Sequence, residues 1–334
     1  MELDDLSATT SPLPWQSQQW SRLLRQLEDG QLPHAMLFTG AQYSGKAQFA
    51  LALARLLLCA EPRDGLGCGN CHACVLSRGG SHGDFLWLAP EPPSRAIKID
   101  QVRSALQFTA RTAGFGLRKV VVFNPADALN LNAFNALLKC LEEPSENTHL
   151  MLVCHRPHAL PATIRSRCQR CELPLPGEQE ASDWLGQVAG EETRRSLLLA
   201  DNKPMLAKAL FETGELDDVE TRLLALRGLL EGKLDPPAAQ AAWDGGELTP
   251  FLDNLAGQLF AFLRQQGAAT LRTPRARGLF ALLDELASLR AAVEAGANPN
   301  PQMTISAILA KMHTLLGGSS AGDNMRERTG RRSQ

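Results

Sequence analysis

The stretch of sequence that decides the fold is AMLFTGAQYSGKA, residues 35–47. Its first five residues form a largely apolar run that predicts a buried strand, and the residues after Lys46 predict a helix. Between strand and helix, Gly40 and Gly45 are separated by four residues, and Lys46 follows directly. This is the pattern of a Walker A loop, in which glycines let backbone N–H groups surround phosphates and the lysine neutralises their charge. The segment therefore predicts a phosphate loop that opens a helix.

The loop lacks the residues that would hold magnesium. Ala47 stands where Walker A has a Ser or Thr hydroxyl for the metal. After the apolar run Lys119–Phe123, an ATPase would carry Asp to organise the magnesium and Glu to orient the attacking water. This chain has Asn124 and Pro125 at those positions. The other nearby carboxylates lie past the strand or at a helix end: Asp127, Glu142 and Glu143. We therefore expect no ATP hydrolysis, and nucleotide binding itself is doubtful.

The two halves of the chain differ in their patterns. Strands are predicted at 35–39, 85–89, 119–123, 150–154 and 170–173, with helices between them that include 100–112, capped by Asp100, and 131–143. Such alternation indicates a parallel α/β sheet. After residue 173 no strand is convincing, and Leu- and Ala-rich helices are predicted near 218–231, 248–266, 277–295 and 303–316. The predicted fold class is α/β followed by all-α.

The changes of pattern also predict the domain boundaries. We expect an α/β domain over 1–176, with an inserted cysteine module at about 59–80, and a small helical domain over 177–214. A larger helical domain would cover 215–317, and the polar stretch 318–334 would be a disordered tail.

Composition narrows the class of partners. Of the 334 residues, 44% are hydrophobic and 21% are charged, and the formal net charge is -2. A protein with this net charge is not expected to bind nucleic acid non-specifically over its whole surface. The acidic N-terminus has no apolar signal-peptide core, and no run of eighteen apolar residues occurs. We expect a cytoplasmic protein without membrane contact. In that reducing compartment the eight cysteines are expected to be metal ligands or buried thiols.

Four of the cysteines have metal-binding spacing. Cys59, Cys68, Cys71 and Cys74 follow the pattern C-x8-C-x2-C-x2-C within a glycine-rich segment. Four thiolates suit a structural Zn²⁺ with no open position for water, although an iron–sulfur cluster fits the same spacing. The nearby imidazoles are spare candidates: His72 and His82. Cys168 and Cys171 form a second C-x2-C pair, but no further residues that could complete a metal or redox site are found near them. We expect buried thiols at Cys140, Cys154 and Cys171.

Several further segments carry a resemblance to a known family. Together with the phosphate loop and the cysteine cluster they are Leu32–Phe38, Phe134–Lys139, Leu141–Pro144 and Leu160–Cys168. Over roughly residues 30–175 the chain resembles the bacterial clamp-loader ATPases of the DNA polymerase III holoenzyme, which have an AAA+ fold. It departs from the motor subunits at Ala47, Asn124 and Pro125, and also where Met205 takes the place of a sensor arginine. Cys154-His155 stand where a sensor threonine would be expected. These losses are similar to those of the delta-prime type.

The resemblance implies a set of roles. The AAA+ domain would be followed by a helical lid and by a collar domain that joins subunits in a ring. The partners would be motor subunits of the gamma/tau type and a delta subunit, with the sliding clamp and primer-template DNA reached through the complex. The chain would be a stator, not an enzyme by itself, within a DNA-directed DNA polymerase assembly associated with the nucleoid. The zinc would be structural.

One arginine would act outside its own subunit. Ser166-Arg167-Cys168 resembles the family motif that presents an arginine finger to the nucleotide of a neighbouring subunit, with Arg165 as second candidate. The bland alternative is that Arg167 pairs with a carboxylate of its own domain. Two alternative functions also stand beside the stator. One is a motor subunit with an atypical site, and the other is a zinc-bearing nucleic-acid adaptor.

Overall fold

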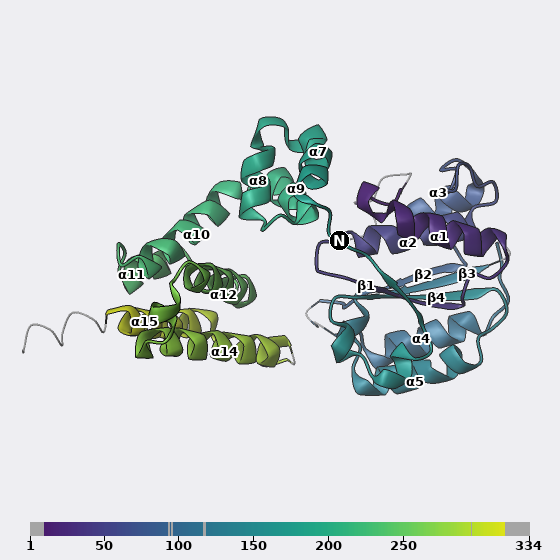
Figure 1. Cartoon of the computed structure of the whole chain (residues 1–334). Coiled ribbons are helices and arrows are strands. Elements are labelled where there is room, and N and C mark those ends of the chain that lie inside the picture. Colours follow the sequence, from purple (N-terminus) through teal and green to yellow (C-terminus); the bar gives the residue numbers. More distant parts are fainter. Residues whose placement is uncertain (1–9, 93, 95, 116–117, 295, 318–334) are drawn as a thin grey trace, which may run out of the picture. The chain divides into compact units, whose positions relative to one another are not determined.

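The computed structural model describes residues 10–92, 94, 96–115, 118–294 and 296–317, and it divides the chain into two compact units, Met1–Glu212 and Thr213–Gln334 (Figure 1). The predicted tail at 318–334 lies outside the described residues. Among the described residues, no helix is both long enough and apolar enough to cross a membrane.

The first unit contains a parallel sheet of five strands in the order β2-β3-β4-β1-β5. All five predicted strands form, with ends shifted by at most two residues: β1 Ala35–Thr39, β2 Phe85–Leu88, β3 Lys119–Phe123, β4 Thr148–Cys154 and β5 Gln169–Glu172. Strands β1, β3 and β4 are buried along their whole length, which explains their nearly unbroken apolar sequences.

Helices cover both faces of this sheet. The first unit contains 3-10 helix η2 Pro14–Gln16 and helices α1 Ser17–Glu28, α2 Lys46–Leu58, α3 His72–Arg78, α4 Ile99–Thr109, α5 Leu131–Glu142 and α6 Ala162–Arg165. Helices α1 and α2 lie on one face of the sheet, and α4 and α5 lie on the other (Figure 1). Alternate strand residues face opposite sides, so Leu37 packs in the core with α4 and α5, while Met36 and Phe38 pack in the core with α1 and α2. The predicted cap Asp100 is wrong, because α4 begins after Lys98 and Asp100 lies inside its first turn.

Three helices follow the sheet: α7 Glu178–Ala189, α8 Thr193–Leu199 and α9 Pro204–Thr213. Ala181 and Leu185 of α7 and Leu197 of α8 are buried. Met205, which the resemblance predicts to stand in place of a sensor arginine, lies half-buried in the first turn of α9.

The second unit is entirely helical within the described residues. It consists of α10 Leu216–Leu230, α11 Pro236–Ala241, α12 Leu248–Arg264, α13 Ala268–Leu271, α14 Pro274–Glu294 and α15 Pro301–Gly317. Its core surrounds Trp243 and Phe251, whose rings meet edge to face at 5.1 Å. The four long helices match the predicted ones. The short helices α11 and α13 were missed, because a segment of six residues or fewer shows too little periodicity.

Candidate functional site

The register of the sheet brings the nucleotide-site positions to one edge. Thr39 is paired with Cys154, so β1 and β4 end together, and β3 ends at Phe123 opposite Leu152, two residues earlier at the same edge. The phosphate loop, Asn124-Pro125 and Cys154-His155 therefore follow adjacent strands at the carboxyl edge, where ligands bind in parallel α/β sheets.

The lysine of the phosphate loop, Lys46, donates hydrogen bonds to acceptors of the loop itself. Gly45 has φ +83°, a left-handed conformation that starts α2 and that favours glycine. Lys46 is only 2% exposed. Its ammonium donates to Gly40 O at 3.0 Å, Ala41 O at 2.5 Å and Ser44 Oγ at 3.4 Å. A lysine has three N–H donors, so the loop itself provides an acceptor for each. Burial lowers the pKa of Lys46 to about 8, against the opposing effects of Asp127 and Cys154.

The N-terminal segment Leu13–Gln16 also contacts the phosphate loop. The carbonyl oxygen of Ser44 accepts from Gln16 Nε2 at 2.8 Å and from Trp15 Nε1 at 3.3 Å. Leu13 packs so tightly that a Cβ on Gly45 would lie 2.1 Å from its Cδ1 atom. Trp15 in turn meets Trp184 of α7 edge to face at 5.4 Å. Sequence reasoning missed this contact, although two apolar residues, Leu13 and Trp15, in a polar stretch were its signal.

Asp127, the carboxylate that opposes the lowering of the Lys46 pKa, has partners of its own. Its Oδ1 accepts from the backbone N–H of His155 at 2.9 Å, and its Oδ2 accepts from Arg156 Nε at 3.0 Å. Burial would raise the pKa of Asp127, but these hydrogen bonds and the nearby positive charges outweigh it, so the pKa lies below its ordinary value. Burial, with Lys46 acting in the same direction, lowers the pKa of His155. Both oxygens of the Asp127 carboxylate therefore bind the segment that follows β4.

Arg167 lies at the surface of the same unit and is also paired. Its Nη2 lies 2.6 Å from Glu142 Oε1, and its Nη1 donates to Thr163 O at 3.0 Å. The arginine side chain is 36% exposed and the glutamate side chain 50% exposed. The alternative role considered for Arg167, an ion pair within its domain, is therefore present in the structure.

The residues on either side of Arg167 are anchored within the same unit. Ser166 Oγ donates to Thr163 O at 3.2 Å, and Cys168 is buried in the core beside Ile164. Burial raises the pKa of Cys168 to about 11, which suits an inert packing residue. Arg165, the second candidate, is exposed and lines a pocket of about 330 Å³ with five other residues, Leu37, Pro157, Ala162, Ser166 and Arg170.

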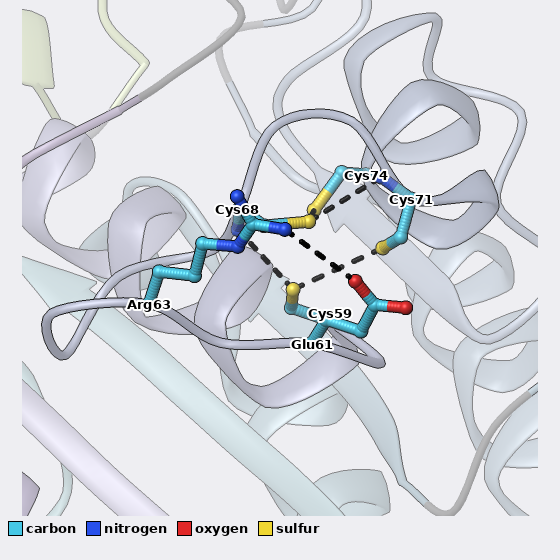
Figure 2. A network of polar contacts seen from close by, with 6 residues as sticks. All are labelled: Cys59, Glu61, Arg63, Cys68, Cys71 and Cys74. Atoms are coloured by element: carbon cyan, nitrogen blue, oxygen red, sulfur yellow. Dashed lines mark hydrogen bonds and ion pairs between the residues drawn. The ribbon is translucent and has the colours of Figure 1, made fainter.

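The four spaced cysteines converge in one cluster, which Figure 2 shows from close by. Cys59 ends α2, and the chain then turns back through Asp64 and Gly65, both with positive φ. The Arg63 and Leu66 backbones pair across this turn at 2.9 and 2.8 Å, as in a two-residue hairpin. Cys68 is thereby returned to Cys59, to whose sulfur it donates its backbone N–H at 3.2 Å. Cys71 and Cys74 lie at the start of α3.

The geometry of the cluster fits a tetrahedral metal centre. Its four sulfur atoms lie within 4.8 Å of one another, with separations of 3.8 Å for Cys59–Cys71 and 4.0 Å for Cys68–Cys74. Four sulfurs placed tetrahedrally at the usual zinc–sulfur bond length would be about 3.8 Å apart. Burial would raise the pKa of Cys71, but backbone hydrogen bonds from Cys74 and Ala60 lower it to about 6.

The two spare histidines are not part of the cluster. His72 is exposed, and its ring lies 6.2 Å from that of Phe115. His82 is buried and accepts the backbone N–H of Asp84 at Nδ1. The other four cysteines are buried. Cys168 and Cys171 pack in the cores on opposite faces of the sheet, so their C-x2-C spacing forms no shared site.

The strand order, the loop after β1 and the helical second half define the class as an AAA+ α/β fold with a helical C-terminal part. A DNA polymerase III gamma-subunit-related protein of Thermotoga maritima shares the fold. The two superpose with a TM-score of 0.55 at 21% identity, over 89% of this chain and 99% of that one.

Sequence comparison gives the family. Residues 15–176 match the family model described as DNA polymerase III, delta subunit. The DNA polymerase III subunit delta' of Pseudomonas aeruginosa is 35% identical over 257 residues, which are 76% of this chain and 77% of that protein. The subunit delta' of Escherichia coli is also 35% identical, over 64% of this chain and 65% of that protein. The chain belongs to the family of DNA polymerase III delta-prime clamp-loader subunits.

A further match is to a subunit with another name. The DNA polymerase III subunit tau/gamma of Haemophilus influenzae is 32% identical over 166 residues, which are half of this chain and 24% of that protein.

Proposed function

We propose that this chain is a non-hydrolysing stator of the DNA polymerase III clamp loader, which helps to load the sliding clamp onto primed DNA. Its neighbours would be a motor subunit of the gamma/tau type and a delta subunit, joined through the helical domain after residue 214. Membership in the delta-prime family supports the proposal that this chain is part of the clamp-loader complex. The observation that carries the stator role is the loop itself, where Lys46 donates to three acceptors of its own loop.

The missing magnesium ligands support the same role. Ala47, Asn124 and Pro125 offer neither a hydroxyl nor a carboxylate, and Asp127 is paired with Arg156. Phosphate binding would require Lys46 to exchange its loop acceptors for phosphate oxygens. Hydrolysis would further require a magnesium ligand and a residue that orients water, which these positions do not supply.

Arg167 would be the contribution of this chain to catalysis. We propose that it acts as an arginine finger in trans, completing the nucleotide site of a neighbouring motor subunit. Its exposure and the anchoring of Ser166 and Cys168 on either side support this role, because they leave the guanidinium at the surface on a fixed backbone. A finger of this kind neutralises charge on the transferred phosphoryl group and makes hydrolysis depend on assembly.

The test is the DNA-stimulated ATPase of a reconstituted clamp loader that contains this chain or its Arg167→Ala variant. Assembly of both complexes is confirmed first by gel filtration. A finger supplied in trans contributes roughly 10³–10⁵ in rate in related systems, so a drop of more than about tenfold is expected. Arg165→Ala is measured in parallel, because Arg165 is the second candidate and is also exposed. A loss in Arg165→Ala instead of Arg167→Ala would assign the finger to Arg165.

Three results would favour other functions. An unchanged rate in the Arg167→Ala complex would remove the finger and leave a structural subunit. Magnesium-dependent ATPase of the isolated chain would instead indicate a motor with an atypical site. Tight, salt-sensitive DNA binding by the isolated chain would point to the nucleic-acid adaptor.

We further propose that Cys59, Cys68, Cys71 and Cys74 bind a structural Zn²⁺. The four sulfurs leave no ligand position for water, so the ion would stabilise the module between α2 and β2 without catalysing a reaction. Cys74→Ser should reduce the bound zinc measured by mass spectrometry and lower the melting temperature of the chain. Purified wild-type protein without zinc, or chelation without any change in melting, would argue against the site.

A further inference from the structure

The carboxylate that pairs with Arg167 comes from a different element. Glu142 is the last residue of α5, whereas Arg167 follows α6 in the chain. The guanidinium is thus bound at two points, by Glu142 Oε1 at 2.6 Å and by the Thr163 carbonyl at 3.0 Å. Two acceptors on separate elements restrict both the position and the rotation of the guanidinium.

Glu142 is not explained by the stability of its own helix. Carboxylates at a helix C-terminus face the negative end of the helix dipole, where they are unfavourable. Glu143, the next residue, has the same chemistry and the same exposure class, but no ion pair involving it is found among the described residues. The ion pair with Arg167 therefore distinguishes Glu142 from its neighbour.

The pair leaves Arg167 able to bind a further anion. A guanidinium has five N–H donors, and the two contacts to Glu142 and Thr163 use two of them. The side chain is also 36% exposed, so the remaining donors are accessible from outside the unit. A flexible arginine loses rotamer freedom when it binds, and a partner that already orders it reduces that loss.

We propose that Glu142 is a positioning residue that holds the Arg167 guanidinium ready for an oxyanion of a neighbouring subunit, the phosphates of its bound nucleotide. This inference rests on the proposed function of Arg167 as an arginine finger. Glu142 itself touches no nucleotide in this arrangement and acts only through Arg167.

The experiment compares reconstituted clamp loaders with Glu142→Ala, Glu142→Gln and Glu143→Gln chains. Glu142→Ala should lower kcat of the DNA-stimulated ATPase by about three- to tenfold, with KM for ATP little changed, because contacting residues are coupled by this order of magnitude. Glu142→Gln retains the acceptor oxygen and should recover part of the loss. Glu143→Gln should behave as wild type.

The double variant separates positioning from a structural role. On the Arg167→Ala background, Glu142→Ala should have no further effect on kcat, since its partner is already gone. An equal loss on that background would overturn the proposal, because Glu142 would then act without Arg167. A higher rate for Glu142→Ala would also overturn it and would mean that Glu142 restrains the finger.

A second measurement distinguishes failure of this inference from failure of the finger. In the isolated full-length chain, nitrogen-15 relaxation of the Arg167 Nε–H group should show an ordered side chain that becomes mobile in Glu142→Ala. If the side chain is ordered but Arg167→Ala leaves hydrolysis unchanged, the finger fails and positioning toward a nucleotide fails with it. If Arg167→Ala lowers hydrolysis but Glu142→Ala changes neither mobility nor kcat, only this inference fails.

Discussion

Two cations of the first unit, Lys46 and Arg167, both belong to motifs associated with phosphate binding, but they lie in opposite surroundings. Lys46 is almost fully buried and donates to three acceptors of its own loop. Arg167 is exposed and pairs with one carboxylate and one carbonyl while retaining free donors. The two cations therefore differ in accessibility. Lys46 is held by acceptors of its own loop, whereas Arg167 keeps N–H donors that an anion from outside the unit could reach.

The largest expected effect concerns the geometry of the exposed cation. Arg167→Lys retains the positive charge but loses the planar fork that binds two oxygens at once. We therefore expect a loss of roughly 10²-fold in hydrolysis at the neighbouring nucleotide site that Arg167 is proposed to complete. Single-turnover phosphate release from the reconstituted complex measures it. Wild-type rates with lysine would show that charge alone suffices and would weaken the contrast with Lys46.

A smaller effect, on stability, is expected from substitution of Asp127. Asp127→Asn should lower the free energy of unfolding by about 1–3 kcal/mol, because it removes a charge-assisted partner of Arg156. The native pKa of Asp127 is depressed, so its contribution is present above the unfolded pKa of about 4 and is lost as pH falls below it.

Urea unfolding at pH 7 and at pH 3.5 checks this prediction. The difference between wild type and variant should be full at pH 7 and should shrink at the lower pH. An unchanged stability together with a lost ATPase of the complex would instead assign Asp127 to magnesium.

The burial of Lys46 should affect the free energy of unfolding above neutral pH. The native pKa of Lys46 is about 8, below the ordinary lysine value, so burial of its charge destabilises the fold at pH 7. As pH rises from about 8 toward 10, the native state loses this proton before the unfolded state does, and stability increases. Relative to Lys46→Met, wild type should gain about 1–2 kcal/mol between pH 7 and pH 9.5, measured by urea unfolding. Parallel curves for the two proteins would mean that Lys46 is not desolvated.

The smallest effect is predicted where a working motor would show the largest. Because Lys46 donates within its own loop, Lys46→Met should leave the DNA-stimulated ATPase of the assembled clamp loader within about twofold of wild type. A large loss with intact assembly would show that the loop binds a phosphate in the complex, and the comparison with Arg167 would fail.

The sheet could be predicted because strands buried on both faces carry nearly unbroken apolar runs, as KVVVF at β3 does. The cysteine cluster was also predictable, since short spacings and an Asp-Gly turn determine where the chain returns. The cap of α4 was not, because a polar residue inside the first turn resembles one that precedes it. The two shortest helices of the second unit gave no periodic signal.

The family of this chain, and the magnesium-binding side chains that its loop and strand-end positions lack, can be read from the sequence alone. Ala47, Asn124 and Pro125 cannot supply the missing hydroxyl and carboxylates in any conformation. The partners of the remaining charged and polar groups follow instead from how the chain folds in three dimensions. The partners of Ser44, Asp127 and Arg167 are Gln16, Arg156 and Glu142, each more than 20 positions away. Sequence spacing cannot reveal such pairs, because they arise where separate elements pack and where buried polar groups must find acceptors or donors.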